Sequence, residues 1–192
     1  MKIKKAVQIM IEEYLIGHCS PTLASLKTAN LMNIPFDTIE NLENSVFQTN
    51  EKLKNKGVEL LILKKCSNTA LVYAYRKDKL QNDLNKNKVD EFLKFYGYES
   101  NDADYCISKL KSRLKNSASF PHEIGIFLGY PLCDVIGFIE NAGQNSICSG
   151  CWKVYCNECE AIKTFKKFEK CKRIYQKLWL QGRSIVKLTV TT

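Results

Sequence analysis

Two apolar runs in the middle of the chain, Val58–Lys65 and Thr69–Arg76, carry the clearest strand pattern. Both are rich in aliphatic and aromatic residues, and the short polar segment Cys66–Asn68 between them has the composition of a turn. The pattern therefore predicts a β-hairpin. The segment Thr22–Ile34 contains a shorter apolar stretch that is consistent with a further strand.

Much of the remaining chain shows the helical period, in which apolar residues recur every three or four positions. Lys5–Ile16 has this pattern, and Gly17 is placed to end the helix before a turn at His18–Pro21. Asp37 or Thr38 is placed to cap the next helix. The helices predicted after this point cover residues 38–56, 78–95, 102–115, 124–128, 132–139 and 158–181.

The resulting fold class is α+β: a small sheet that includes the central hairpin, covered by several helices. The sequence contains no repeat, no low-complexity segment and no composition shift that would mark a domain boundary. A length of 192 residues is enough for one sizeable core. We therefore expect residues 1–192 to form a single domain.

The helix predicted over residues 158–181 is strongly amphipathic. The residues expected to face the core are Ile162, Phe165, Phe168, Cys171, Ile174 and Leu178. The opposite face carries Lys163, Lys166, Lys167, Lys170, Lys172, Arg173 and Lys177. Such a basic face is most often solvated surface over a core stripe, and the alternative is a surface for RNA or an acidic protein.

The composition is that of an ordinary globular protein, with 45% hydrophobic and 26% charged residues. No stretch approaches the roughly 20 apolar residues that a membrane span needs. The first apolar run closes at Glu12 and Glu13 without a small-residue cleavage site, which argues against a signal peptide. We therefore expect a cytoplasmic protein with no membrane association.

The net charge of +9 comes mainly from lysine, because only Arg76, Arg113, Arg173 and Arg183 are arginines among 29 basic residues. Arginine is the residue favoured for bidentate contacts to phosphates and bases. The charge therefore favours solvated surface, and nucleic acid is not the expected partner.

Nine cysteines stand out in a chain expected to be cytoplasmic, where thiols stay reduced. They predict free thiols or metal ligands rather than structural disulfides. Four are clustered as Cys148, Cys151, Cys156 and Cys159. If Trp152–Tyr155 is a strand, Cys151 and Cys156 lie about 16 Å apart on opposite faces, so the four are not expected to share one zinc ion.

Cys156 and Cys159 are the candidate redox pair of this cluster. They flank the predicted start of the last helix, and helix N-termini stabilise thiolates. Glu158 and Glu160 oppose this effect with negative charge. The alternative is that both thiols are inert packing residues.

The two histidines lie in predicted turns flanked by proline and supply the candidate catalytic residues: His18 with Cys19, and His122 with Glu123. A histidine can activate a thiol as its base. The candidate anion-binding residues are Lys27, Arg76 and Lys153. The alternative for each histidine is a purely structural role in its turn.

Three motifs resemble an uncharacterised family, a domain of unknown function found in cytosolic proteins of anaerobic bacteria. They are HCxPTLAxxK from His18 to Lys27, FPHEIGIFLGYP from Phe120 to Pro131 with the following Asp134-Val135, and GxWKVY from Gly150 to Tyr155. The resemblance covers essentially the whole chain. It implies that these segments are hallmarks of the family. Members of the family are often encoded near genes for flavodoxins and iron uptake, which implies a role in anaerobic redox or metal metabolism.

Two hypotheses of function follow. The first is a cytosolic redox- or metal-linked protein with a Cys/His site, in which Cys19 is the reactive thiol or ligand and His18 or His122 its partner. The second is a non-enzymatic binding module that uses the basic helix face for RNA or for an acidic protein such as a flavodoxin. Substrate, cofactor and metal are not determined by the sequence, nor is whether the protein is an enzyme.

Overall fold

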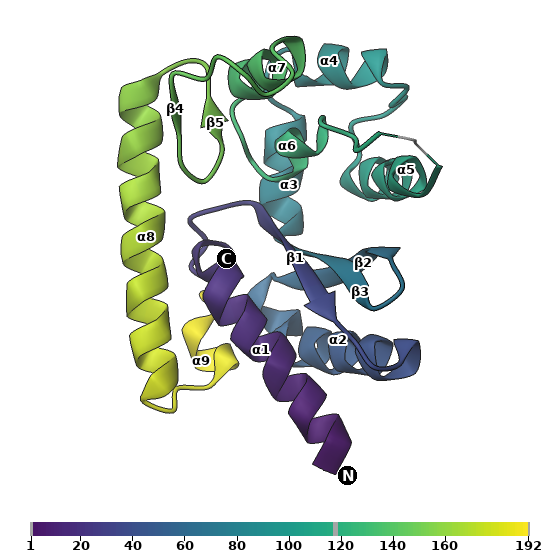
Figure 1. The fold of residues 1–192 in the computed structure, drawn as a ribbon, viewed down its shortest axis with the longest axis vertical. Helices are drawn as coiled ribbons and strands as arrows, with labels where there is room; N and C mark the ends of the chain where they lie inside the picture. Colours follow the sequence, from purple (N-terminus) through teal and green to yellow (C-terminus); the bar gives the residue numbers. More distant parts are fainter. Residues whose placement is uncertain (1, 117–118, 192) are drawn as a thin grey trace. The chain divides into compact units, whose positions relative to one another are not determined.

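The computed structural model describes residues 2–116 and 119–191, which form an α+β fold as predicted (Figure 1). The chain groups into two compact units. The first unit contains the chain up to Asp78 and the segment from Cys171 onward, and the second unit is Lys79–Lys170. Each unit is described by itself below. The single domain expected over residues 1–192 stays a prediction.

The first unit is built on a three-stranded antiparallel sheet with the order β1-β3-β2. β2 (Glu59–Lys65) and β3 (Thr69–Tyr75) form the predicted hairpin, and β1 (Ala29–Pro35) pairs with the other edge of β3. The predicted third strand is thereby confirmed. One face of the sheet carries alternate apolar residues that join the core, among them Met32, Leu60, Val72 and Ala74.

Helices α1 (Lys2–Leu23) and α2 (Ile39–Leu53) contact each other and the sheet, and their buried side chains complete this core (Figure 1). The hydroxyl of Thr38 caps α2 by accepting a hydrogen bond from Asn41 N at 3.2 Å. A short 3-10 helix, η1 (Lys54–Lys56), follows, and α9 (Ile185–Leu188) contacts α1.

The prediction that the first helix ends at Gly17 is wrong, because α1 continues through His18 and Pro21 to Leu23. Cys19 and Leu23 are fully buried in the core, so packing of this last turn outweighs the weak helix propensity of glycine and proline. His18 and Cys19 therefore lie on a helix and not in a turn.

The second unit is mainly helical. Its elements are α3 (Lys77–Leu84, which starts in the first unit), α4 (Val89–Phe95), α5 (Ala103–Asn116), α6 (Ile124–Phe127), α7 (Leu132–Glu140), the strand pair β4 (Cys148–Ser149) and β5 (Lys153–Val154), and the start of α8 (Glu158–Leu180). The continuous helix predicted over residues 78–95 is in fact two helices. Lys88 interrupts it with a left-handed φ of 64°.

Helix α8 is amphipathic as predicted, but its buried face is shifted. Ile162 and Ile174, which we expected in the core, are 37% and 46% exposed. Phe168 and Cys171 are buried as predicted, and Ala161 is buried beside them. Periodicity alone does not decide which flank of an apolar face is covered. None of the described helices has the length and apolar character that crossing a membrane requires.

Candidate functional site

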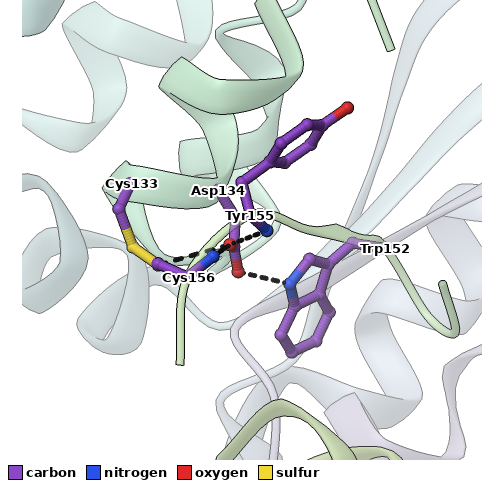
Figure 2. Close-up of a disulfide and its surroundings, with 5 residues drawn as sticks. All are labelled: Cys133, Asp134, Trp152, Tyr155 and Cys156. Atoms are coloured by element: carbon purple, nitrogen blue, oxygen red, sulfur yellow. Dashed lines mark hydrogen bonds between the residues drawn. A yellow bond between two sulfur atoms is a disulfide. The ribbon is translucent and has the colours of Figure 1, made fainter. Parts of the chain in front are cut away.

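A disulfide joins Cys133 to Cys156 in the second unit (Figure 2). Cys133 is the second residue of α7, and Cys156 lies between β5 and α8. Their Cα atoms are 6.3 Å apart, within the range of protein disulfides. The expectation that the cysteines are free thiols is therefore wrong for this pair, because the fold brings together two residues that are 23 positions apart.

Asp134 lies next to the disulfide and is only 2% exposed. Its Oδ1 accepts hydrogen bonds from the backbone N–H groups of Tyr155 at 2.7 Å and Cys156 at 3.0 Å. Its Oδ2 accepts one from Trp152 Nε1 at 2.7 Å (Figure 2). A single carboxylate on α7 thus fixes the chain from Trp152 to Cys156.

Close packing supports this arrangement. The Trp152 ring stacks on Tyr130 with 5.0 Å between centroids and meets Phe165 edge-on at 4.5 Å. Gly137 on α7 leaves room for the Tyr155 ring, since a Cβ at this position would lie 2.5 Å from the Cβ of Tyr155. The segment before Cys156 is therefore held by side-chain packing as well as by Asp134.

The two sulfurs differ in their surroundings. Cys133 is exposed, whereas Cys156 is half-buried and its Sγ lies 3.3 Å from Asp134 Oδ1. In the disulfide Cys156 has no proton, but after reduction its S–H can donate to this oxygen. The site therefore has one accessible sulfur and one sulfur beside a buried carboxylate.

Within the described residues, Cys133, Asp134 and Cys156 form a group whose potential ligand atoms all lie within 4.8 Å of one another. The group includes one of the four clustered cysteines, Cys156. That these four do not share a metal stays a prediction. Cys148, Cys151 and Cys159 are free thiols. The predicted redox pair of Cys156 with Cys159 is wrong, since Cys156 is bonded to Cys133.

Cys19 belongs to the first unit, where it is fully buried. Burial raises the pKa of its thiol to about 12, and the positive charges of Lys27 and Lys172 offset only part of this rise. The predicted activated thiol with a lowered pKa is therefore wrong. His18 is exposed, and its ring lies 5.6 Å from that of Tyr14.

Arg76 is 1% exposed and its guanidinium binds the protein's own backbone. It donates to the carbonyl oxygens of Thr22 and Leu23 at 2.7 Å each, Lys56 at 2.9 Å and Val190 at 2.8 Å. This geometry corrects the prediction of an anion site at Arg76, because backbone carbonyl oxygens take the place of the anion.

The other candidate anion-binding residues are Lys27 and Lys153. Lys27 is buried, with 8% of its surface exposed. Lys153 is half-buried, and its Nζ donates a hydrogen bond to the carbonyl oxygen of Gly143. Anion binding by these two residues stays a prediction.

Glu123 is 1% exposed and forms an ion pair with Arg113, and it accepts a hydrogen bond from Tyr98 OH at 3.3 Å. Burial, followed by the charge of Glu123, raises the pKa of Tyr98. His122 is exposed, with its ring 5.1 Å from that of Phe138. His18 and His122 belong to different units, and a shared catalytic site stays a prediction.

Sequence reasoning did not select Cys133 or assign a role to Asp134. A usable signal was present, because Pro131 marks the start of a helix and places both residues in its first turn. The partner of Cys133 could not be found in this way, since it depends on how β5 packs against α7.

Comparison with known proteins places the chain in a family. The model of the family described as "Protein of unknown function (DUF3793)" matches residues 15–189, so the chain belongs to this family. No curated protein and no solved structure matches the chain.

Proposed function

We propose that this member of the DUF3793 family is a thiol–disulfide redox protein of anaerobic metabolism, with Cys133 and Cys156 as its redox pair. The observation that carries the proposal is the disulfide between an exposed cysteine in the first turn of a helix and a half-buried cysteine beside Asp134. In the cytoplasm, the location we propose, disulfides are usually transient and serve catalysis or redox sensing.

The surroundings of the two sulfurs assign them different roles. Cys133 lies at the N-terminus of α7, where the helix dipole stabilises a thiolate, and its exposure makes it accessible to a partner. Cys156 lies beside a carboxylate, which favours its protonated thiol over its thiolate. Cys133 is therefore the sulfur that a partner attacks and the nucleophile of the reverse reaction.

The reductant is a partner dithiol. Its thiolate attacks Cys133 Sγ and forms a mixed disulfide, while the bond to Cys156 breaks and Cys156 leaves as a thiolate that takes a proton from solvent. The second partner thiol loses its proton to solvent and attacks the partner's sulfur in the mixed disulfide, and Cys133 leaves as a thiolate. The partner is oxidised to a disulfide, and this protein gains two electrons.

An equilibrium titration in dithiol/disulfide buffers tests the proposal, with free thiols alkylated and counted by mass spectrometry. We expect reversible two-electron behaviour at a potential between roughly −300 and −120 mV, the range of known dithiol redox proteins. Cys133→Ser and Cys156→Ser should abolish the transition, and Cys159→Ser should leave it unchanged. The proposal fails if the disulfide does not re-form on oxidation or if Cys159→Ser removes the transition.

The basic face of α8 supports an acidic protein, such as a flavodoxin, as a binding partner. Lys163, Lys166, Lys170, Arg173 and Lys177 follow one another at helical spacing and span about 21 Å. They lie opposite the buried face, and all are exposed. Fields of one sign steer oppositely charged partners.

The basic face is tested with a double substitution, Lys166→Glu with Lys170→Glu, and binding to a flavodoxin measured at two salt concentrations. We expect affinity to fall at least tenfold, with a weaker dependence on salt. The matched control, Lys111→Glu, changes an exposed lysine on α5 and should have little effect. Binding of a short single-stranded RNA in preference to the flavodoxin would refute an acidic protein as the partner of this face.

A further inference from the structure

We propose that opening the Cys133–Cys156 disulfide converts the same place into a Zn²⁺ site, with Cys133, Cys156 and Asp134 as ligands. The inference rests on the proposed redox function, because Cys133 and Cys156 can bind a metal as thiolates only in the reduced protein. The oxidised protein is the metal-free state, and reduction in the presence of metal gives the metal-bound state.

The donor atoms are already close together. The two sulfurs and a carboxylate oxygen lie within 4.8 Å of one another. A tetrahedral zinc site with Zn–S bonds near 2.3 Å needs neighbouring sulfurs about 3.8 Å apart. Asp134 holds the Cys156 backbone to α7 through the Cys156 N–H, and this hydrogen bond does not depend on the disulfide, so it can keep the two sulfurs near each other after reduction.

The buried carboxylate provides an independent argument for a cation. Asp134 is 2% exposed, and its hydrogen bonds come from two backbone N–H groups and an indole, all of them neutral. Among the residues described, no ion pair involves Asp134. Buried charges are normally paired or coordinate a metal, and a bound zinc ion would give the Asp134 carboxylate a cation to coordinate.

Zinc compensates the two negative charges that reduction creates at the site. Two thiolates and one carboxylate carry three negative charges, and a divalent cation leaves one, the same net charge as Asp134 beside the disulfide. Sulfur ligands select zinc over magnesium or calcium. The Asp134 carboxylate accepts three hydrogen bonds, two at Oδ1 and one at Oδ2, and so retains a free lone pair for the metal. Water takes the fourth position on the exposed Cys133 side.

The test uses the full chain reduced with a phosphine under argon and titrated with Co²⁺ as a spectroscopic probe, then with Zn²⁺ in competition. We expect one Co²⁺ per chain with thiolate charge-transfer and tetrahedral d–d absorption, displaced by Zn²⁺. Oxidation to the disulfide should release the metal. Cys133→Ser and Cys156→Ser should each weaken binding at least 100-fold, whereas Cys66→Ser and Cys159→Ser should bind as the wild type does.

Asp134→Asn keeps the shape of the side chain but removes its charge, and we expect it to weaken binding 10- to 100-fold. Circular dichroism shows whether this variant folds, and Cys133→Ser keeps the test decisive if it does not. Equal binding to the oxidised protein, or loss of binding in Cys159→Ser, overturns the ligand set. Disulfide exchange measured in the presence of a chelator separates the two proposals: exchange without metal binding refutes the zinc site alone, and metal binding without exchange refutes the redox function.

Discussion

Replacing Arg76 by methionine tests whether the buried guanidinium is a structural clamp. Methionine keeps an unbranched apolar stem, but it is shorter than arginine and has no donor. Arg76 follows β3 and binds the end of α1 through Thr22 and Leu23, η1 through Lys56, and the C-terminal segment through Val190. The substitution therefore removes a connection among segments that are far apart in sequence.

The magnitude follows from the burial of the four hydrogen bonds. The bonds to Thr22 and Leu23 are buried, and hydrogen bonds to a charged group contribute about 1.5–3 kcal/mol each. The bonds to Lys56 and Val190 are partly exposed, so water replaces the guanidinium there at little cost. We expect Arg76→Met to lower the free energy of unfolding by about 4 kcal/mol and the melting temperature by roughly 8–16 °C.

Urea denaturation followed by circular dichroism and by tryptophan fluorescence measures this loss, since one of the two tryptophans, Trp179, packs against the core of the first unit. Arg173→Met is the matched control, because Arg173 is exposed on α8 and its loss should change stability by less than about 0.5 kcal/mol. Arg76→Lys should fall between the wild type and Arg76→Met, since an ammonium retains the charge without the planar fork. An unchanged urea midpoint in Arg76→Met would refute the clamp.

Three further predictions concern the cysteines and glycines. Cys133→Ser should lower the free energy of unfolding by about 3 kcal/mol under oxidising conditions, because the disulfide joins residues 23 positions apart. Wild type and variant should be equally stable in reductant. A difference that persists in reductant contradicts this explanation. Because burial raises the pKa of Cys19 to about 12, this thiol should be alkylated at pH 8 far more slowly than the exposed Cys66. Mass spectrometry of timed samples measures both rates. Equal rates would mean that Cys19 is not buried. Gly137→Ala should lower the free energy of unfolding by about 1–3 kcal/mol, because the new Cβ displaces the Tyr155 ring. Gly17→Ala places a Cβ with nothing within 4 Å of it and should stabilise α1 by up to about 1 kcal/mol. The same urea measurement compares the two variants, and destabilisation by Gly17→Ala would show that the helix ends at this residue.

Local patterns predicted the elements well where one short segment contains the whole signal. The hairpin of β2 and β3 follows from two apolar runs around a polar turn, and α2 follows from its Thr38 cap and apolar period. Two helix ends were wrong for different reasons. Packing of Cys19 and Leu23 extends α1 past Gly17, and the left-handed backbone at Lys88 interrupts a helix whose sequence has no proline or glycine there.

The candidate site, too, was partly predictable from local sequence and partly decided by tertiary contacts. The sequence alone was enough to recognise the cysteines, an aspartate at the start of a helix and the resemblance to an uncharacterised family, because residue type and spacing are local properties. Tertiary structure decided which of these residues matter together. It buried Cys19 and raised its pKa, turned Arg76 toward backbone carbonyls, and bonded Cys156 to Cys133 instead of Cys159. Burial and pairing depend on contacts between distant segments, and a thiol's reactivity is set by those contacts rather than by its neighbours in the chain.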